Sequence, residues 1–329
     1  MGPGIRSRAT VALVLVTAIW GSTFFLIKGA VAAYDPVDFL AIRFAIAALI
    51  MGALFHRRLR GLGRRAWRDG LVLGFVYGLA QVAQTWGLRI TDASISGFVT
   101  GTYVIITPLL MWLLWRRPIG RGMWAAVILA FAGLAVLSLT GFSADAGALI
   151  TLVSAIIYAV HIILLEKPSQ RMDATALATI QIFGIALTCG ILAIPGGIEL
   201  PASGEVWGAI LYTAVIAGIV TMTLQTWAQG HLSPTRTAVI MTLEPVFAST
   251  FAVLFSDESL TARLLLGGAL ILAAMVVGVL TDTPGEDPAS GGPGTGAPRG
   301  AASAGDAPIT EEADPPGRPP GRDAPEPAV

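Results

Sequence analysis

Long apolar runs, separated by short polar connections, fill the first 281 residues of the chain. A helix needs about 20 mostly apolar residues to cross the hydrocarbon core of a bilayer. Because lipid offers the backbone no hydrogen-bond partners, helices are the economical way to cross it. The pattern therefore predicts an all-α integral membrane protein with ten transmembrane helices. The predicted spans cover residues 10–33, 36–55, 70–90, 95–115, 122–141, 146–165, 174–194, 206–229, 234–255 and 262–281.

Lysine and arginine gather at one set of the connections between the predicted spans. Fourteen of them fall on the side that holds the N-terminus, and six of these are arginines in the tract His56–Asp69. Arg89 and Arg263 are the two on the opposite side. Because basic loops mark the cytoplasmic side of a membrane protein, we predict a multi-pass protein of the plasma (cell) membrane with both termini cytoplasmic.

Residues 282–329 differ in composition from the rest of the chain. They hold 11 of the 20 prolines and 9 of the 38 glycines, and they have few large apolar side chains. A segment of this kind buries too little surface to offset the entropy lost on ordering. We therefore predict a disordered, acidic cytoplasmic tail rich in Pro, Gly and Ala.

Composition narrows the class of protein further. The chain is 54% hydrophobic and 13% charged with a mean hydropathy of +0.73, whereas a soluble domain has about 25% charged residues. These values exclude a soluble globular enzyme and a nucleic-acid binder, and they leave the lipid bilayer as the expected surrounding. The net charge of zero combines +6 in the body with −6 in the tail. The single cysteine, Cys189, excludes an internal disulfide and a cysteine-cluster metal site, and no cofactor is expected.

The two halves of the predicted membrane region repeat each other in order. Gln84-Thr85-Trp86 precedes Pro108, which lies 24 residues after the glutamine, and Gln225-Thr226-Trp227 precedes Pro245 at a distance of 20 residues. A constant spacing of 138 residues relates three further pairs: Trp20 and Tyr158, Lys28 and Glu166, and Arg43 and Gln181. Each half then has five spans, so the second half enters the membrane inverted. Inverted repeats are typical of secondary transporters, whose substrate site lies between the halves.

Several short segments, in this order, resemble a known family. They are Ile19-Trp20-Gly21-Ser22-Thr23 with Lys28, Ala41-Ile42-Arg43-Phe44-Ala45, Gly87-Leu88 with Thr91, Ala93 and Ser94, Thr107-Pro108, Leu243-Glu244-Pro245-Val246-Phe247, and Asp257-Glu258. The chain resembles the EamA-type transporters of the drug/metabolite transporter (DMT) superfamily, which have two tandem five-helix repeats. The resemblance implies one EamA-like repeat at residues 10–141 and a second at 146–281. The pair Arg116-Arg117 departs from the family pattern, because many members have an acid there.

Three ionisable residues inside predicted spans are candidates for transport or proton coupling: Glu244, Arg43 and His161. Charges within a membrane are costly, so each is a functional candidate by default. Glu244 has the chemistry to bind and release a proton, or it is a structural residue that is protonated or paired with Arg236. Arg43 either holds an anionic group or pairs with an acid. His161 either relays protons or is a polar residue facing the bundle interior, and we favour the second role.

Five aromatic or amide residues are candidates to line the substrate cavity: Trp20, Gln84, Tyr103, Tyr158 and Gln225. Aromatic and amide side chains suit amphipathic or aromatic solutes. The two glutamines are the stronger candidates because a buried amide must find a hydrogen-bond partner, whereas tryptophan also populates the membrane interface.

Prolines, a lysine and paired glycines carry further expectations. Pro108 and Pro245 lack an N–H group, so we expect each to kink its helix. Lys28 is expected to extend towards the membrane surface, a structural role. The pairs Gly74/Gly78 and Gly97/Gly101 permit close helix contact, which we expect within the protomer rather than in a dimer.

The sequence as a whole favours a secondary active transporter that exports small metabolites, amino acids or drugs by alternating access, with protons as a coupling ion. An uncoupled facilitator and a lipid flippase are the alternatives. A membrane-embedded enzyme is disfavoured because the sequence has no HExxH or GxSxG motif, and it has no P-loop for hydrolysing ATP. Substrate identity, transport direction and oligomeric state do not follow from the sequence.

Overall fold

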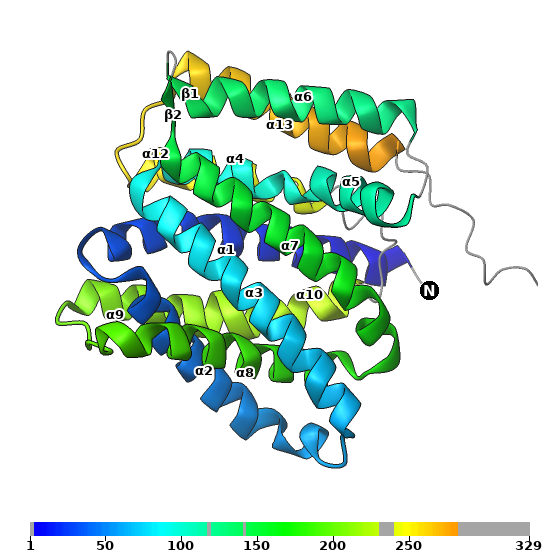
Figure 1. Ribbon diagram of the computed structural model, residues 1–329, viewed down its shortest axis with the longest axis vertical. Coiled ribbons are helices and arrows are strands. Elements are labelled where there is room, and N and C mark those ends of the chain that lie inside the picture. Colours follow the sequence, from blue (N-terminus) through cyan, green and yellow to red (C-terminus); the bar gives the residue numbers. More distant parts are fainter. Residues whose placement is uncertain (1–2, 117–119, 141–142, 230–239, 282–329) are drawn as a thin grey trace, which may run out of the picture. The chain divides into compact units, whose positions relative to one another are not determined.

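The structure is a computed structural model that describes residues 3–116, 120–140, 143–229 and 240–281. Within these ranges the chain is almost entirely helical (Figure 1). Between α6 and α7, the two-residue strands β1 (Leu139–Thr140) and β2 (Ser143–Ala144) pair antiparallel. The helices are α1 Pro3–Ala33, α2 Pro36–Leu59, α3 Arg64–Ile90, α4 Ala93–Gly101, α5 Tyr103–Trp115, α6 Arg121–Ser138, α7 Ala146–Arg171, α8 Ala174–Ala193, η1 Ile194–Gly196, α9 Gly204–Leu211, η2 Tyr212–Val220, α10 Thr221–Gln229, α12 Glu244–Phe255 and α13 Ala262–Thr281.

Six of the described helical segments are long and apolar enough to cross a membrane. They are Ser7–Ala33, Pro36–Leu59, Arg64–Ile90, Ala93–Leu114, Ala146–Leu165 and Ala174–Gly196. Four shorter apolar helices are Arg121–Leu137, Gly204–Val220, Glu244–Phe255 and Ala262–Gly278. The predicted all-α fold is confirmed over the described ranges, whereas the number of ten spans stays a prediction. The predicted tail, Arg236 and the first residues of the span at 234–255 lie outside the described residues.

Aspartates in the short connections start several of these helices. Asp35, Asp145 and Asp173 accept hydrogen bonds from backbone N–H groups in the first turns of α2, α7 and α8, at 2.7 to 3.2 Å. Such a cap satisfies backbone donors that have no partner within the helix. The polar connections seen in the sequence therefore begin the helices as well as separating them.

Three predicted spans are interrupted rather than continuous. Thr102 separates α4 from α5, and its N–H bonds the Val99 carbonyl 3.2 Å away, in the tighter i to i−3 pattern. The span at 206–229 contains the nine-residue π-helix η2. In the span at 234–255, Thr242 and Leu243 form a turn immediately before α12. Each interruption departs from the α-helical hydrogen-bond pattern inside an apolar stretch, a feature tolerated in membranes where protein surrounds the backbone.

Glycines allow neighbouring helices to approach closely. A Cβ atom on Gly74 would lie 2.3 Å from the Gln181 carbonyl oxygen of α8, and one on Gly97 would lie 2.6 Å from the Ala248 Cβ of α12. The second glycine of each GxxxG pair also faces a neighbouring helix. The close packing within the protomer that was predicted for both pairs is therefore confirmed.

Helices from both predicted repeats pack against one another within residues Met1–Thr283, which form one compact unit. Helix α3 runs beside α7 and α8, α1 lies along α12 and α10, and α6 pairs with α13 (Figure 1). Buried Phe39, Leu40 and Met51 of α2 belong to the largest apolar core, where α2 packs on α8. The candidate site residues therefore sit on helices whose positions are fixed by extensive packing.

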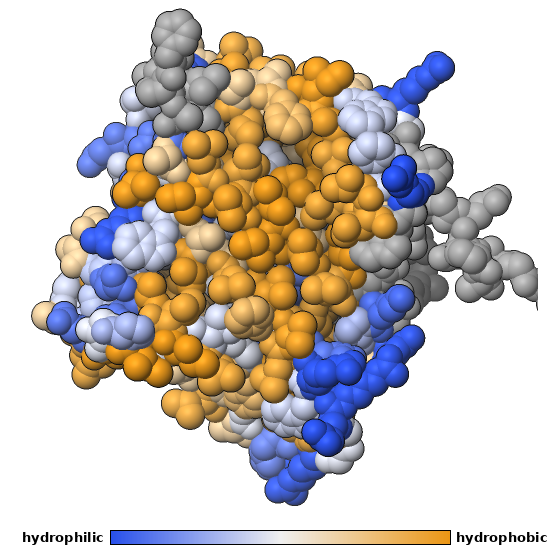
Figure 2. Space-filling model, viewed as in Figure 1, coloured by the Kyte–Doolittle hydropathy of each residue, from blue (hydrophilic) through white to orange (hydrophobic). Residues whose placement is uncertain are grey.

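Large apolar side chains also cover much of the outer surface. Leu49, Ile128 and Leu187 are 74%, 69% and 58% exposed. Figure 2 shows a broad apolar band across the face in view, with hydrophilic side chains gathered towards its left and right edges. An exposed apolar surface of this extent indicates contact with lipid, in agreement with the composition.

Candidate functional site

A chain of hydrogen bonds joins the polar side chains of α3 to those of α7 and α4. Gln81 donates from Nε2 to the hydroxyl oxygen of Tyr158 at 2.6 Å. Tyr158 in turn donates to Gln84 Oε1 at 3.0 Å, and Gln84 Nε2 donates to the Thr100 hydroxyl at 3.1 Å. The structure therefore brings together two predicted cavity residues, Gln84 and Tyr158, from opposite halves of the chain.

Aromatic rings surround this chain of hydrogen bonds. Tyr77 meets Tyr158 edge-on with ring centroids 5.1 Å apart, and Tyr103 of α5 lies 6.5 Å from Tyr158. Tyr77 also meets the ring of His161 at 5.1 Å. Edge-to-face pairs of this kind stabilise a fixed arrangement of rings. We call Tyr77, Gln81, Gln84, Tyr103, Tyr158 and His161 the tyrosine cluster.

His161 has a defined partner inside the bundle. The residue is buried, and its Nε2 atom lies 2.8 Å from Gln181 Oε1 of α8. A neutral imidazole that donates this hydrogen bond is satisfied without a charge. This geometry fits the structural role that the sequence analysis favoured for His161.

Arg43 is buried without a partner for most of its guanidinium group. The residue is 7% exposed, and neither Nε nor Nη1 has a hydrogen-bond partner in the described part of the chain. The guanidinium carbon lies 4.5 Å from the centre of the Phe44 ring. Tyr77 and Tyr158 are close enough to interact with its charge. A buried cation without an anion is costly, and no described residue supplies that anion to Arg43.

Glu244 is the acidic counterpart of Arg43 at the tyrosine cluster. It is the first residue of α12 and partly buried, and no described residue forms a hydrogen bond or ion pair with its carboxyl group. Tyr77, Tyr103 and Tyr158 are close enough to interact with its charge. The proposed pairing with Arg236 concerns a residue outside the described ranges.

The two prolines have different surroundings. Pro108 lies inside α5, as expected for a proline that interrupts the helical hydrogen bonds. Pro245, expected inside a continuous span, is instead in the first turn of α12. A first-turn N–H has no partner within the helix, so proline is tolerated there without a kink. The turn at Thr242 and Leu243 therefore marks the bend that the sequence attributed to Pro245.

Two other predicted cavity residues do not join these hydrogen bonds. Trp20 of α1 donates from Nε1 to the Ala217 carbonyl at 3.1 Å and to the Thr221 hydroxyl at 2.9 Å, which ties α1 to η2 and α10. Gln225 of α10 is partly buried and makes no hydrogen bond with a described residue. The bonds of Trp20 therefore give it a structural role, whereas the side-chain amide of Gln225 has no hydrogen-bond partner among the described residues.

Sequence reasoning missed Tyr77 and Gln81, although a signal was present. Tyr77, Gln81 and Gln84 follow one another at spacings of four and three residues in α3. Positions with that spacing share one face of a helix. A polar face on an apolar helix points to the bundle interior, so the whole face was recognisable from the sequence.

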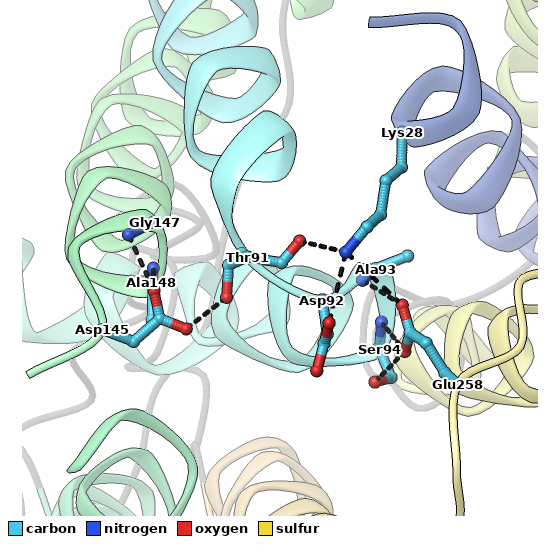
Figure 3. A network of polar contacts seen from close by, with 9 residues as sticks. All are labelled: Lys28, Thr91, Asp92, Ala93, Ser94, Asp145, Gly147, Ala148 and Glu258. Atoms are coloured by element: carbon cyan, nitrogen blue, oxygen red, sulfur yellow. Dashed lines mark hydrogen bonds and ion pairs between the residues drawn. The ribbon is translucent and has the colours of Figure 1, made fainter. Parts of the chain in front are cut away.

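A second polar network lies near the far ends of these helices, around Lys28 (Figure 3). Its Nζ atom donates to the Thr91 carbonyl at 2.6 Å and to Asp92 Oδ1 at 3.2 Å, and it lies 3.9 Å from Glu258 Oε1. Lys28 is therefore held by the connection between α3 and α4 and by the connection before α13. These bonds support the structural role predicted for Lys28, whereas its extension towards the membrane surface stays a prediction.

Glu258 caps α4 from a distant part of the sequence. Its carboxylate accepts hydrogen bonds from the backbone N–H groups of Ala93 and Ser94 at 2.6 and 3.2 Å, and from the Ser94 hydroxyl at 2.5 Å (Figure 3). Asp145 joins the same network by accepting a hydrogen bond from the Thr91 hydroxyl. The network therefore links residues from both predicted repeats at one end of the bundle.

The amino-acid sequence of the chain is similar to a family profile and to several known proteins. Residues 7–139 and 145–280 each match the profile of the EamA-like transporter family. An uncharacterized transporter of Archaeoglobus fulgidus is 33% identical over 273 residues, which cover 83% of this chain and 86% of the relative. The uncharacterized transporter YvbV of Bacillus subtilis is 27% identical over 290 residues, covering 82% of this chain and 91% of the relative.

A solved crystal structure shares the fold. It aligns with a TM-score of 0.59 and 19% sequence identity, covering 83% of this chain and 97% of its own. At this identity the likeness concerns the arrangement of helices alone. The family profile and the sequence relatives therefore carry the functional comparison.

Proposed function

Because the chain belongs to the EamA-like transporter family, we propose that it is a secondary active transporter that exports small metabolites, amino acids or drugs. The chain is a multi-pass membrane protein, and its family implies a small-molecule substrate. The observation that carries the proposal is the pair of unpartnered charges, Arg43 and Glu244, which both lie near tyrosines of the cluster.

Alternating access supplies the proposed transport cycle. The ten predicted spans form two inverted five-helix repeats, residues 10–141 and 146–281, and the substrate binds between them. The tyrosine cluster draws on α3 and α5 of the first repeat and α7 of the second. Rocking of one repeat against the other would therefore change which side of the membrane reaches the cluster.

Glu244 is the proposed proton carrier. An unpartnered carboxylate in a poorly hydrated place gains stability by binding either a proton or a cationic group. In the proposed cycle, Glu244 binds a proton from outside, and the return to the inward-facing state releases this proton to the cytoplasm. Substrate then binds from the cytoplasm and leaves on the outside, so one proton enters as one substrate leaves.

Arg43 is the proposed anchor for an anionic group of the substrate. Planar guanidinium groups bind carboxylate and phosphate oxygens through paired N–H donors. The Nε and Nη1 atoms of Arg43 have no hydrogen-bond partner among the described residues, so each is free to donate to such an oxygen. The surrounding tyrosine rings suit an apolar or aromatic part of the same molecule.

A substrate search followed by a flux measurement tests the proposal. Amino acids, nucleobases and aromatic carboxylates are screened for compounds that raise the melting temperature of the purified protein, because a ligand of the native state stabilises it by mass action. The best compound is then loaded with the protein into proteoliposomes. We expect accumulation against its concentration gradient when a pH gradient is imposed. With a facilitator, net flux would stop once the compound reached equal concentrations on both sides. That result would contradict active transport and favour the facilitator.

A further inference from the structure

A pocket of about 580 Å³ opens between the first turns of α3 and the last turns of α7, away from the tyrosine cluster. Four basic side chains and one acid line it: Arg65, Arg68, Lys167, Arg171 and Asp69. We call it the basic pocket. Figure 2 shows hydrophilic side chains gathered at the lower right, where α3 begins in Figure 1.

The packing of α3 on α7 explains why the pocket opens at this end. At the other end of the pair, a Cβ atom on Gly87 would lie 2.4 Å from the Thr151 hydroxyl oxygen and 2.7 Å from the Gly147 carbonyl oxygen. Small residues hold the helices together there, whereas long basic side chains line the opening between Gly63 and Met172. The pocket is therefore a consequence of the way the two helices pack.

The charges of the basic pocket do not cancel. Asp69 lies 2.8 Å from Arg68 and 3.7 Å from Arg65, so one carboxylate serves two arginines. Lys167 and Arg171 make no ion pair with a described residue. The lining keeps a formal excess of three positive charges. An anionic group would therefore be attracted to this place.

The start of α3 adds donors to the same lining. Its N-cap, Gly63, offers no side chain to the free N–H groups of the first turn, and Gly63, Arg65 and Ala66 all line the pocket. The N-terminus of a helix favours negative charge. Together with the four cations, this end of α3 is suited to a phosphate group.

The remainder of the lining is apolar and faces outwards. Val72 and Leu164 are 47% and 43% exposed on the surface of the bundle, and Met172 completes this part of the wall. A soluble anion would gain nothing from these side chains. A molecule with an anionic head and an apolar chain would contact both parts.

We propose that the basic pocket binds an anionic phospholipid, with its phosphate among the four cations and the start of an acyl chain along Val72 and Leu164. Basic pockets between transmembrane helices recognise anionic lipid headgroups in this way. Topology and helix-end charge explain single basic residues near a membrane surface. They do not explain why four of them converge on one pocket with an apolar wall.

Melting of the full-length protein in detergent tests the proposal. Phosphatidylglycerol is titrated against the wild type, with phosphatidylcholine and glycerol 3-phosphate as separate arms. We expect phosphatidylglycerol to raise the melting temperature, and the other two to leave it unchanged. A rise with glycerol 3-phosphate alone would indicate a soluble anion site and overturn the lipid assignment. An unchanged melting temperature with phosphatidylglycerol would contradict the proposal that the pocket binds an anionic phospholipid.

Paired variants locate the effect. The double variant Lys167→Gln with Arg171→Gln removes two cations of the basic pocket. The control, Arg57→Gln with Arg60→Gln, removes two exposed cations of the tract His56–Asp69 that do not line the pocket. Each charge-assisted hydrogen bond to a bound phosphate is worth about a tenfold gain in affinity. The pocket variant, which loses two such donors, should therefore need about 100-fold more phosphatidylglycerol for the same shift in melting temperature. Equal behaviour of the two variants would show non-specific attraction and contradict the proposal.

Discussion

At the scale of single residues, Arg43 and Glu244 differ from the other polar side chains around the tyrosine cluster. Tyr158, Gln84 and His161 have hydrogen-bond partners at 2.6 to 3.1 Å. Arg43 and Glu244 do not have such partners among the described residues. Because an unpaired charge inside a membrane protein is costly, the proposed cycle assigns the binding of a proton and of the substrate to these two positions.

Glu258 has the opposite character, since its carboxylate has several partners. Replacing Glu258 with Gln removes the charge that pairs with Lys28 and weakens the cap of α4. Loss of a helix cap costs about 1 kcal/mol, so we expect a lower melting temperature in detergent. The control is Glu199→Gln, at an exposed residue whose side chain makes no bond with the described chain. Equal melting of the two variants would show that the cap contributes nothing.

Tyr34, in the connection between α1 and α2, provides a pH-dependent test. Burial, followed by the charges of Asp38, Asp35 and Glu199, raises its pKa from 10.0 to about 12. The tyrosine resists ionisation in the native state, so its contribution to stability is complete below pH 10 and falls as the pH rises towards 12. The absorbance difference between wild type and Tyr34→Phe should therefore titrate near pH 12. A midpoint near pH 10 would exclude the buried environment.

At the scale of helices, the sequence predicted the elements better than their interruptions. Apolar length and Asp-rich connections located the starts of α2, α7 and α8 because both signals are local. The break at Thr102 and the π-helix η2 have no comparable local signal, since they depend on what packs around them. The break at Leu243 does have one, because Pro245 is favoured in the first turn of a helix.

The candidate site was predictable to a similar degree. Residue types identified Gln84, Tyr103, Tyr158, Arg43 and Glu244, because polar side chains are rare in apolar spans. Spacing alone did not show that Trp20 bonds to Ala217, since that partner lies on a distant helix. Contacts between helices far apart in sequence are set by packing, which a single sequence does not reveal.

The close approach of α3 to α8 gives a prediction about packing. A methyl group on Gly74 would lie 2.3 Å from the Gln181 carbonyl oxygen and 2.7 Å from Gly184 Cα, so backbone would have to move. Gly74→Ala should lose about 1–3 kcal/mol of stability. Gly29→Ala is the control, because no atom lies within 4 Å of its Cβ position, and helix propensity favours alanine by about 1 kcal/mol. Thermal melts in which both variants match the wild type would contradict this contact.

At the scale of the whole molecule, the two predicted repeats are interleaved. Helix α3 of the first repeat packs on α7 and α8 of the second, and α1 packs on α12. The tyrosine cluster lies among these contacts, and the network of Lys28 and Glu258 ties both repeats together near one end. Movement of one repeat against the other would therefore rearrange the cluster and this network together.

The predicted orientation can be tested by labelling single cysteines. In a Cys189→Ala background, Ala202→Cys lies in the connection between α8 and α9, and Arg57→Cys lies in the last turn of α2, within the basic tract His56–Asp69; both positions are exposed. A membrane-impermeant maleimide applied to intact cells should label Ala202→Cys alone, and Arg57→Cys should react only after lysis. The reverse pattern would contradict the predicted orientation.

The role of Glu244 in coupling is the claim on which the proposed cycle depends most. Proteoliposomes with wild-type protein or Glu244→Gln are loaded with the compound found in the stability screen, and its flux is followed under an imposed pH gradient. Since an amide does not carry the proton, we expect Glu244→Gln to let the compound equilibrate but to lose its pH-driven accumulation. Wild-type accumulation in the Glu244→Gln variant would contradict the coupling mechanism.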